Sequence, residues 1–178
     1  MRIIGGEAKG RRLDTPDEGT RPLTGRAREA LFSILGGTVE GATVLDLFAG
    51  SGSFGLEALS RGAAEVIFVE RDRRAVEVLE RNMGAVDLGG SVQTSTVTDY
   101  LVRSDASFDM VFVDPPYALE DPAVDRVLSL VEDRLNDGAT VIVHRRSGGA
   151  RPKSDNLRLA DKRRYGDTEL WVFAKEGA

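Results

Sequence analysis

Short apolar runs alternate with stretches of helical spacing through the middle of this sequence, and this alternation restricts the possible folds more than any other feature. The runs predict buried strands, because strands of a parallel sheet covered on both sides are apolar on both faces. The predicted strands are Ala42–Phe48, Glu65–Val69, Ser91–Thr96, Phe108–Val113 and Ala139–His144. Repeated strand–helix units imply a parallel sheet with helices on both faces.

The helices between these strands are indicated by apolar residues three and four positions apart. The predicted helices are Ser53–Arg61, Arg73–Met83 and Asp121–Leu135. In the first helix, the spacing turns Phe54 toward the core and leaves Glu57 and Arg61 to solvent. The third helix is predicted to stop at Asn136-Asp137-Gly138, which is a typical breaker sequence.

The C-terminal part of the chain departs from the strand–helix alternation. Leu157–Arg164 and Thr168–Ala174 predict two strands, and the turn Tyr165-Gly166-Asp167 between them is typical of an antiparallel hairpin. With the five strands before them, they give an expected total of seven. Trp171, within the last strand, is expected in the core.

The N-terminal part also differs. Met1–Leu13 carries Gly5-Gly6 between two strand-like halves and predicts a small hairpin. Thr24–Leu35 predicts an amphipathic helix that is capped by Thr24 and turns Ala27, Leu31 and Ile34 toward the core. We therefore expect an extension over residues 1–36, followed by the main domain over residues 37–178.

Composition excludes several kinds of site. There is no Cys, so disulfides and thiolate metal sites are excluded. His144 is the only His, which argues against any metal centre; a structural or surface role is expected for it. No segment reaches the ~20 apolar residues that span a bilayer, and the start has no signal-peptide pattern. The expectation is a cytoplasmic protein without membrane contact.

The net charge of −5 is distributed unevenly. Residues 1–28 hold seven basic and four acidic side chains, and residues 144–164 hold eight and two. Residues 29–143 hold eight basic and twenty acidic side chains. Such an acidic body with basic ends is consistent with nucleic-acid phosphates contacting the ends, although solvated basic segments explain it equally well.

A glycine-rich turn joins the first predicted strand to the first helix. Gly50, Gly52 and Gly55 satisfy the GxGxxG spacing, which lets the backbone turn tightly and lets a ligand approach the main chain. Glu70, at the end of the second strand, is placed to accept hydrogen bonds from two ribose hydroxyls. Together these residues predict a nucleoside-containing cofactor at the carboxyl edge of the sheet.

The choice of cofactor depends on Asp46, a carboxylate within the same turn. It would repel a pyrophosphate but attract a sulfonium and an α-amino group, which favours S-adenosylmethionine, with S-adenosylhomocysteine as its product. The chain also lacks a second domain for a hydride acceptor. An NAD-binding oxidoreductase and a nucleotide-binding module without catalysis are the alternatives from other classes.

Asp114-Pro115-Pro116-Tyr117 follows the fourth predicted strand, beside the predicted cofactor site. The prolines stiffen the loop, the Asp114 carboxylate and the Pro115 carbonyl can accept hydrogens from an amino group, and Tyr117 offers a face for stacking a base. Such a loop orients an exocyclic amine toward an electrophilic methyl group, and the amine needs orientation more than a strong base. Adenine N6 or cytosine N4 of DNA is an alternative target, since this tetrapeptide suits all such amines.

The chain resembles the bacterial 16S ribosomal RNA guanine-N2 methyltransferase family, whose members are class I, Rossmann-like enzymes. The matching segments are Arg2-Ile3-Ile4-Gly5-Gly6, Lys9–Leu13, Arg21-Pro22, Arg26–Phe32, Asp46–Ala64, Phe68–Asp72, Asp114–Tyr117 and Tyr165–Thr168. The resemblance implies N2-methylation of a guanine in 16S rRNA, within a small ribosomal subunit or an assembly intermediate. Leu23 and Gly25 depart from the family, which usually has Thr and Asp at these positions.

The resemblance also implies roles for individual residues. Those expected to bind the cofactor are Asp46, Phe48, Gly50, Ser51, Gly52, Glu70, Arg71, Thr96 and Val97. Those expected to hold the target guanine are Asp114, Pro115, Pro116 and Tyr117. Those expected to contact RNA are Arg2, Lys9, Arg11, Arg12, Arg21 and Arg26. The Thr24–Leu35 helix is expected to lean over the cofactor pocket.

Overall fold

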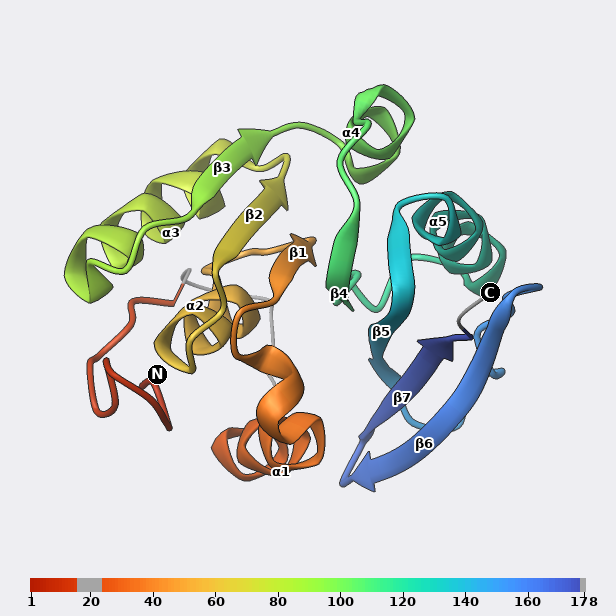
Figure 1. Cartoon of the computed structure of the whole chain (residues 1–178), viewed down its shortest axis with the longest axis horizontal. Coiled ribbons are helices and arrows are strands. Elements are labelled where there is room, and N and C mark those ends of the chain that lie inside the picture. Colours follow the sequence, from red (N-terminus) through yellow and green to blue (C-terminus); the bar gives the residue numbers. More distant parts are fainter. Residues whose placement is uncertain (16–23, 177–178) are drawn as a thin grey trace.

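The seven predicted strands form one sheet in the computed structural model, which describes residues 1–15 and 24–176 (Figure 1). The strands are β1 (Thr43–Leu47), β2 (Glu65–Glu70), β3 (Ser91–Thr94), β4 (Phe108–Val113), β5 (Leu135–Arg146), β6 (Leu157–Tyr165) and β7 (Thr168–Lys175). Their order is β3-β2-β1-β4-β5-β7-β6. β1 to β5 pair with one another in parallel. β6 and β7 form the predicted antiparallel hairpin, and β7 is also antiparallel to β5.

Helices cover both faces of the sheet (Figure 1). They are α1 (Gly25–Leu35), the 3-10 helix η1 (Gly36–Val39), α2 (Ser53–Ser60), α3 (Arg73–Val86), α4 (Val97–Arg103) and α5 (Asp121–Glu132). Alternate residues of each central strand enter two different apolar clusters, because side chains alternate across a strand. Val44 packs with α1, α2 and α3, whereas Leu45 packs with α4 and α5. None of the helices in the described part of the chain has the length and apolar character needed to cross a bilayer.

The predicted end of α3 at Met83 falls three residues short of Val86, and two other predicted boundaries are wrong in ways that affect the site. The third strand ends at Thr94 rather than Thr96, and the Thr96 side chain instead caps α4, a helix of seven residues that the sequence did not indicate. The third predicted helix ends at Glu132, and Leu135 already pairs with Phe108 as the start of β5. A register shift between Phe108 and Met110 then places Asn136-Asp137-Gly138 within β5 rather than at a helix end. Leu135 fits a buried strand as well as the helical spacing, so periodicity could not separate the two.

The N-terminal hairpin is present as an antiparallel bridge between Arg2 and Arg12. Ile3 N donates to Arg11 O at 3.0 Å, and Leu13 N donates to Met1 O at 2.9 Å. The side chains of Ile3 and Leu13 are buried in the same apolar cluster as α1 and α2. The hairpin therefore packs as part of the main core.

Glu57 holds this hairpin against α2, and the prediction that its side chain faces solvent is wrong. The side chain is 0% exposed. Its carboxylate accepts hydrogen bonds from Ile4 N at 2.8 Å and Gly5 N at 2.9 Å, and its Oε1 lies 2.8 Å from Arg61 Nε. A buried carboxylate is tolerated only with such partners, and the hairpin backbone supplies two of them.

Helix α1 contributes a second buried charge next to this carboxylate. Arg28 donates to Met1 Sδ at 2.6 Å and to Arg2 O at 2.5 Å, and its Nε lies 3.8 Å from Glu57. Burial lowers the pKa of Arg28, and the neighbouring Glu57 opposes this shift. Arg28 therefore ties α1 to the start of the hairpin.

The buried face of α1 also differs from the prediction. Thr24 caps the helix as predicted, by accepting from Ala27 N. Ile34 is 40% exposed, however, so its predicted core position is wrong. Phe32 and Leu35 are buried instead; Leu35 follows Leu31 by four residues and Phe32 by three, so it joins both on one face of the helix.

Candidate active site

The site lies where the strand order reverses, between β1 and β4. The chain adds β2 and β3 on one side of β1 and places β4 on the other, which creates a crevice at the carboxyl ends of the strands. Leu47 pairs with Val113, and Asp114 N donates to Leu47 O at 3.3 Å. The glycine-rich turn after β1 and the Asp114–Tyr117 segment after β4 therefore lie side by side.

The turn after β1 is built from left-handed backbone conformations. Gly50 and Gly52 have φ values of 54° and 83°, and Phe48, which is not glycine, has a φ of 59°. Few side chains tolerate this region, so the Phe48 conformation stores strain at the site. A Cβ on Gly52 would also lie 2.4 Å from Leu79 Cδ1. Gly52 is thus required both by its φ and by the approach of α3.

Gly52→Ala is expected to lower the free energy of unfolding by about 1–3 kcal/mol more than Gly138→Ala. Both glycines have a positive φ, but a Cβ on Gly138 would meet no atom within 4 Å. The difference between the two variants therefore isolates the steric cost of a Cβ next to Leu79 and Leu56. Urea unfolding of both variants measures it, and equal losses would show that the contact is relieved without cost.

Glu70 links the end of β2 to the glycine turn. Its Oε2 accepts from Gly50 N at 2.9 Å, and its Oε1 accepts from Arg71 N at 2.8 Å and Asp72 N at 2.9 Å. A carboxylate has roughly four lone-pair positions, so it retains capacity for a further donor after these three bonds. The backbone contacts hold the carboxylate in one orientation at the carboxyl edge.

Asp46 is the least solvated carboxylate of the site, at 1% exposure. Its Oδ2 accepts from Gly55 N at 2.9 Å, whereas its Oδ1 is buried without a partner in the described part of the chain. Burial raises the pKa of Asp46 well above its usual range, and the charges of Asp114 and Glu70 raise it further. A cationic ligand with N–H donors would satisfy Oδ1 and offset this concentration of negative charge.

Asp114 is joined to His144 at the end of β5. Val113 pairs with Val143, so the next residues of the two strands are neighbours, and Asp114 Oδ1 lies 2.7 Å from His144 Nδ1. The Tyr117 ring is 37% exposed, and its centroid lies 6.0 Å from that of His144. His144 was not among the predicted site residues; the signal was its place near the end of β5, which neighbours β4.

The backbone carbonyls of Pro116 and Ser51 each accept a hydrogen bond. Pro115 is buried and Pro116 is exposed. The Pro116 carbonyl accepts from Leu119 N at 2.8 Å, which closes the loop after the motif. Ser51 O accepts from Asn82 Nδ2 at 2.9 Å. Asn82 also bonds both backbone groups of Asp14, so it joins the end of the hairpin to the glycine turn, a link that sequence reasoning missed.

Two of the residues predicted to bind the cofactor, Thr96 and Val97, lie at the start of α4. Thr96 Oγ1 accepts from Asp99 N at 3.1 Å and donates to Asp99 Oδ2 at 2.7 Å, so its hydroxyl is used as a helix cap. Val97 is buried and begins α4. Arg71 is exposed beyond Glu70.

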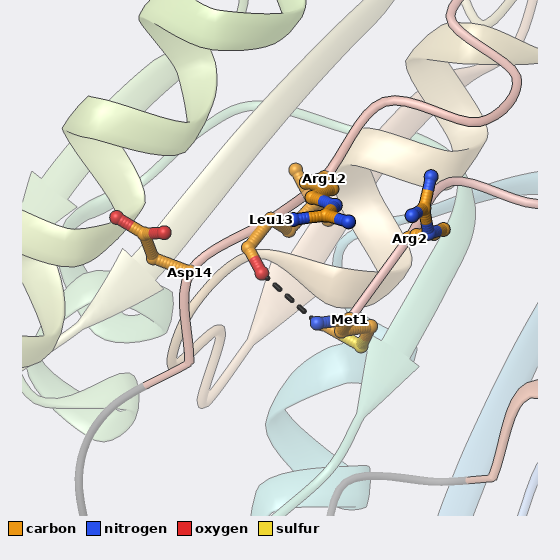
Figure 2. A pocket seen from close by; sticks show the side chains of 5 residues that line it. All are labelled: Met1, Arg2, Arg12, Leu13 and Asp14. Atoms are coloured by element: carbon orange, nitrogen blue, oxygen red, sulfur yellow. Dashed lines mark hydrogen bonds between the residues drawn. The ribbon is translucent and has the colours of Figure 1, made fainter.

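The predicted RNA-contacting residues that the structure describes lie on the hairpin and, for Arg26, on α1. Arg2, Lys9, Arg11, Arg12 and Arg26 are exposed, and Arg21 lies outside the described residues. Figure 2 shows the side chains of Arg2 and Arg12 at an open pocket of about 440 Å³, next to the bond from Met1 N to Leu13 O. Arg2 also donates to Gly10 O at 3.1 Å, and Arg11 to Ala85 O at 2.6 Å.

The fold and the site together define a class I methyltransferase: a seven-stranded sheet in which β7 is antiparallel to both of its neighbours, a glycine-rich turn and an Asp-Pro-Pro-Tyr loop. The chain belongs to the family described as Conserved hypothetical protein 95, whose model matches residues 1–174.

Its relatives include the Ribosomal RNA small subunit methyltransferase D of Escherichia coli strain K12. The two are 40% identical over 147 residues, which cover 80% of this chain and 73% of that protein. The structure of the Escherichia coli protein yhhF superposes with a TM-score of 0.89 at 35% identity, covering 100% of this chain and 99% of that one. A hypothetical protein of Thermus thermophilus gives a TM-score of 0.85 at 33% identity, with 97% of this chain and 98% of that one covered.

Proposed function

We propose that this protein transfers the methyl group of S-adenosylmethionine to the exocyclic N2 amino group of a guanine in 16S rRNA. The observation that carries the proposal is the placement of Asp114–Tyr117 beside the glycine turn, through the pairing of β1 with β4. The relatives named ribosomal RNA small subunit methyltransferase D support rRNA as the substrate.

The hydrogen-bond acceptors of the crevice fit S-adenosylmethionine. Asp46 Oδ1, which is buried and unpaired among the described residues, would accept from the α-amino group of S-adenosylmethionine. Glu70 would accept from the ribose hydroxyls, and Phe48, Gly50, Ser51, Gly52 and Arg71 would line the turn around it. Thr96 and Val97 would complete the cofactor site. When bound, the cofactor supplies an electrophilic methyl group on a sulfonium.

Asp46→Asn is expected to weaken S-adenosylmethionine binding by about tenfold to a hundredfold, because it removes a charged acceptor from the cation.

The same variant also tests the raised pKa of Asp46 through the pH dependence of stability. Folded Asp46 binds its proton more tightly than the unfolded chain does, so its contribution to stability is present at low pH and is lost as pH rises toward the raised folded value. The stability of the wild type relative to Asp46→Asn should therefore fall as the pH rises above about 4, the ordinary pKa of an aspartate.

Calorimetric titration measures the affinity, and urea unfolding across this range measures the stability difference. Asp105→Asn, at an exposed position, is the matched control. Unchanged cofactor affinity in Asp46→Asn, or a stability difference that does not vary with pH, would contradict this role.

The Asp114–Tyr117 segment would hold the target guanine. The Asp114 carboxylate and the Pro115 carbonyl accept from the two N2 hydrogens, which turns the nitrogen lone pair away from them. Pro116 keeps the loop stiff, and Tyr117 stacks on the base and offsets part of the cost of unstacking it. The amine proton is lost after the methyl arrives, and Asp114 is the nearest acceptor for it.

The extension over residues 1–36 would cover the pocket and contact RNA phosphates through Arg2, Lys9, Arg11, Arg12, Arg21 and Arg26. The link from Asp14 through Asn82 to Ser51 supports this, since it holds the end of the hairpin beside the glycine turn. The acidic body of residues 29–143 would repel bare RNA, so we place the reaction on a small subunit or an assembly intermediate, in the cytoplasm.

A panel of acceptors tests this proposal. The protein is incubated with S-adenosylmethionine labelled in its methyl group and with small subunits from cells that lack it, with protein-free 16S rRNA, or with duplex DNA. We expect label in the RNA of the subunits and less in protein-free rRNA. Label in DNA alone contradicts the rRNA assignment, equal labelling of both RNA forms contradicts the subunit context, and binding of NAD instead of S-adenosylmethionine contradicts the cofactor.

A further inference from the structure

The only His of the chain lies behind the Asp-Pro-Pro-Tyr loop rather than on the surface. His144 is 2% exposed, and its Nδ1 lies 2.7 Å from Asp114 Oδ1. Its ring has Phe54 on one side, at 6.5 Å between centroids, and Tyr117 on another, at 6.0 Å, both in edge orientation. One imidazole thus touches two members of the motif that would hold the target base.

The direction of the hydrogen bond follows from the chemistry of the pair. An ionised carboxylate only accepts, so the contact with Asp114 places a proton on Nδ1 of His144. Nε2 of His144 is buried without a partner in the described part of the chain. A proton on Nε2 would therefore be a buried donor without an acceptor, which is costly. Both considerations select the neutral tautomer that carries its proton on Nδ1.

Asp114 needs such a partner because of its position. It follows β4 directly, its side chain is 29% exposed, and the contacts of the described residues engage only its Oδ1. Without His144 the carboxylate could rotate toward solvent, and an orienting group that is displaced by about 1 Å can cost a hundredfold in rate.

We propose that His144 is a positioning residue for methyl transfer. As the neutral Nδ1–H tautomer, it fixes Asp114 through Oδ1, leaves Oδ2 for the target amine, and supports the Tyr117 ring with its edge. This role rests on the proposed function of Asp114, but the tautomer of His144 can be tested without an RNA substrate.

The first test is spectroscopic. In protein labelled with ¹⁵N at histidine, all imidazole signals come from His144, since the chain has one His. Long-range ¹H–¹⁵N correlation spectra should show a protonated Nδ1 and an unprotonated Nε2, and Asp114→Ala should remove this preference. A proton on Nε2 in the wild type, or no change in Asp114→Ala, overturns the proposal.

The second test compares His144→Asn with His144→Gln. The Asn amide nitrogen is as many bonds from Cα as Nδ1 and can replace its N–H, whereas the Gln amide nitrogen corresponds to Nε2. We expect His144→Asn to keep kcat within about fivefold of the wild type and His144→Gln to lose about 10- to 100-fold, with KM for S-adenosylmethionine unchanged in both.

Melting temperatures of both variants control for folding, and a purely structural requirement would favour Gln, which is closer to His in size. Equal kcat in the two variants, or a loss that appears in KM for the cofactor, overturns the positioning role. Absence of methyl transfer by the wild type contradicts the proposed function itself, while the tautomer measured by NMR still stands or fails independently.

Discussion

Asp114→Ala is expected to lower kcat for methyl transfer by about 100- to 1000-fold, the scale seen when an oriented polar group at a reacting centre is removed. The variant loses the acceptor that orients the amine and leaves His144 Nδ1 without its 2.7 Å partner. Asp114 would not contact the ribose or the α-amino group, so affinity for S-adenosylmethionine should stay within about threefold.

Single-turnover kinetics with saturating cofactor measure the chemical step, and calorimetry measures cofactor binding. Asp105→Ala, an exposed aspartate that precedes β4, is the matched control and should behave as the wild type. A wild-type rate in Asp114→Ala would remove this carboxylate from the site, and a loss confined to cofactor affinity would reassign it to the cofactor.

Glu57→Ala is expected to have the largest effect on stability, a loss of about 3–5 kcal/mol in the free energy of unfolding. The substitution leaves the N–H groups of Ile4 and Gly5 without their acceptor and leaves the buried guanidinium of Arg28 uncompensated. The hairpin should detach from α2 before the rest of the chain unfolds, because this carboxylate joins the two.

Urea unfolding and hydrogen exchange at the Ile4 and Gly5 amides measure these effects. Glu65→Ala, at the exposed start of β2, is the matched control and should change stability by less than about 0.5 kcal/mol. If Glu57→Ala does not fold, exchange in the milder Glu57→Gln reports on the hairpin. A loss no larger than that of the control would mean that apolar packing of Ile3 and Leu13 alone holds the hairpin.

The parallel sheet and the meeting of the two motifs were predictable from the sequence. Strands buried on both faces have to be apolar throughout, and Phe108–Val113 and Ala139–His144 show that pattern. Parallel strands present their carboxyl ends at one edge, so a glycine turn after β1 and Asp114 after β4 had to be near one another if the strands were adjacent.

Features that depend on contacts distant in the sequence could not be predicted. Helical periodicity assigns a charged residue such as Glu57 to solvent, and only the hairpin about fifty residues earlier explains its burial. Helix α4 has seven residues, too few to show a period, so Thr96 was assigned to a strand. The position of His144 depends on the register between β4 and β5, which a bulge near Met110 alters.

The identity of the methylated nucleoside tests the central claim most directly. Small subunits from cells lacking this protein are labelled with S-adenosylmethionine and the purified enzyme, and their rRNA is digested to nucleosides and separated by mass spectrometry. We predict that the label is found in N2-methylguanosine and is lost with Asp114→Ala. Label in N6-methyladenosine, in N4-methylcytidine or in ribosomal protein alone would contradict the account.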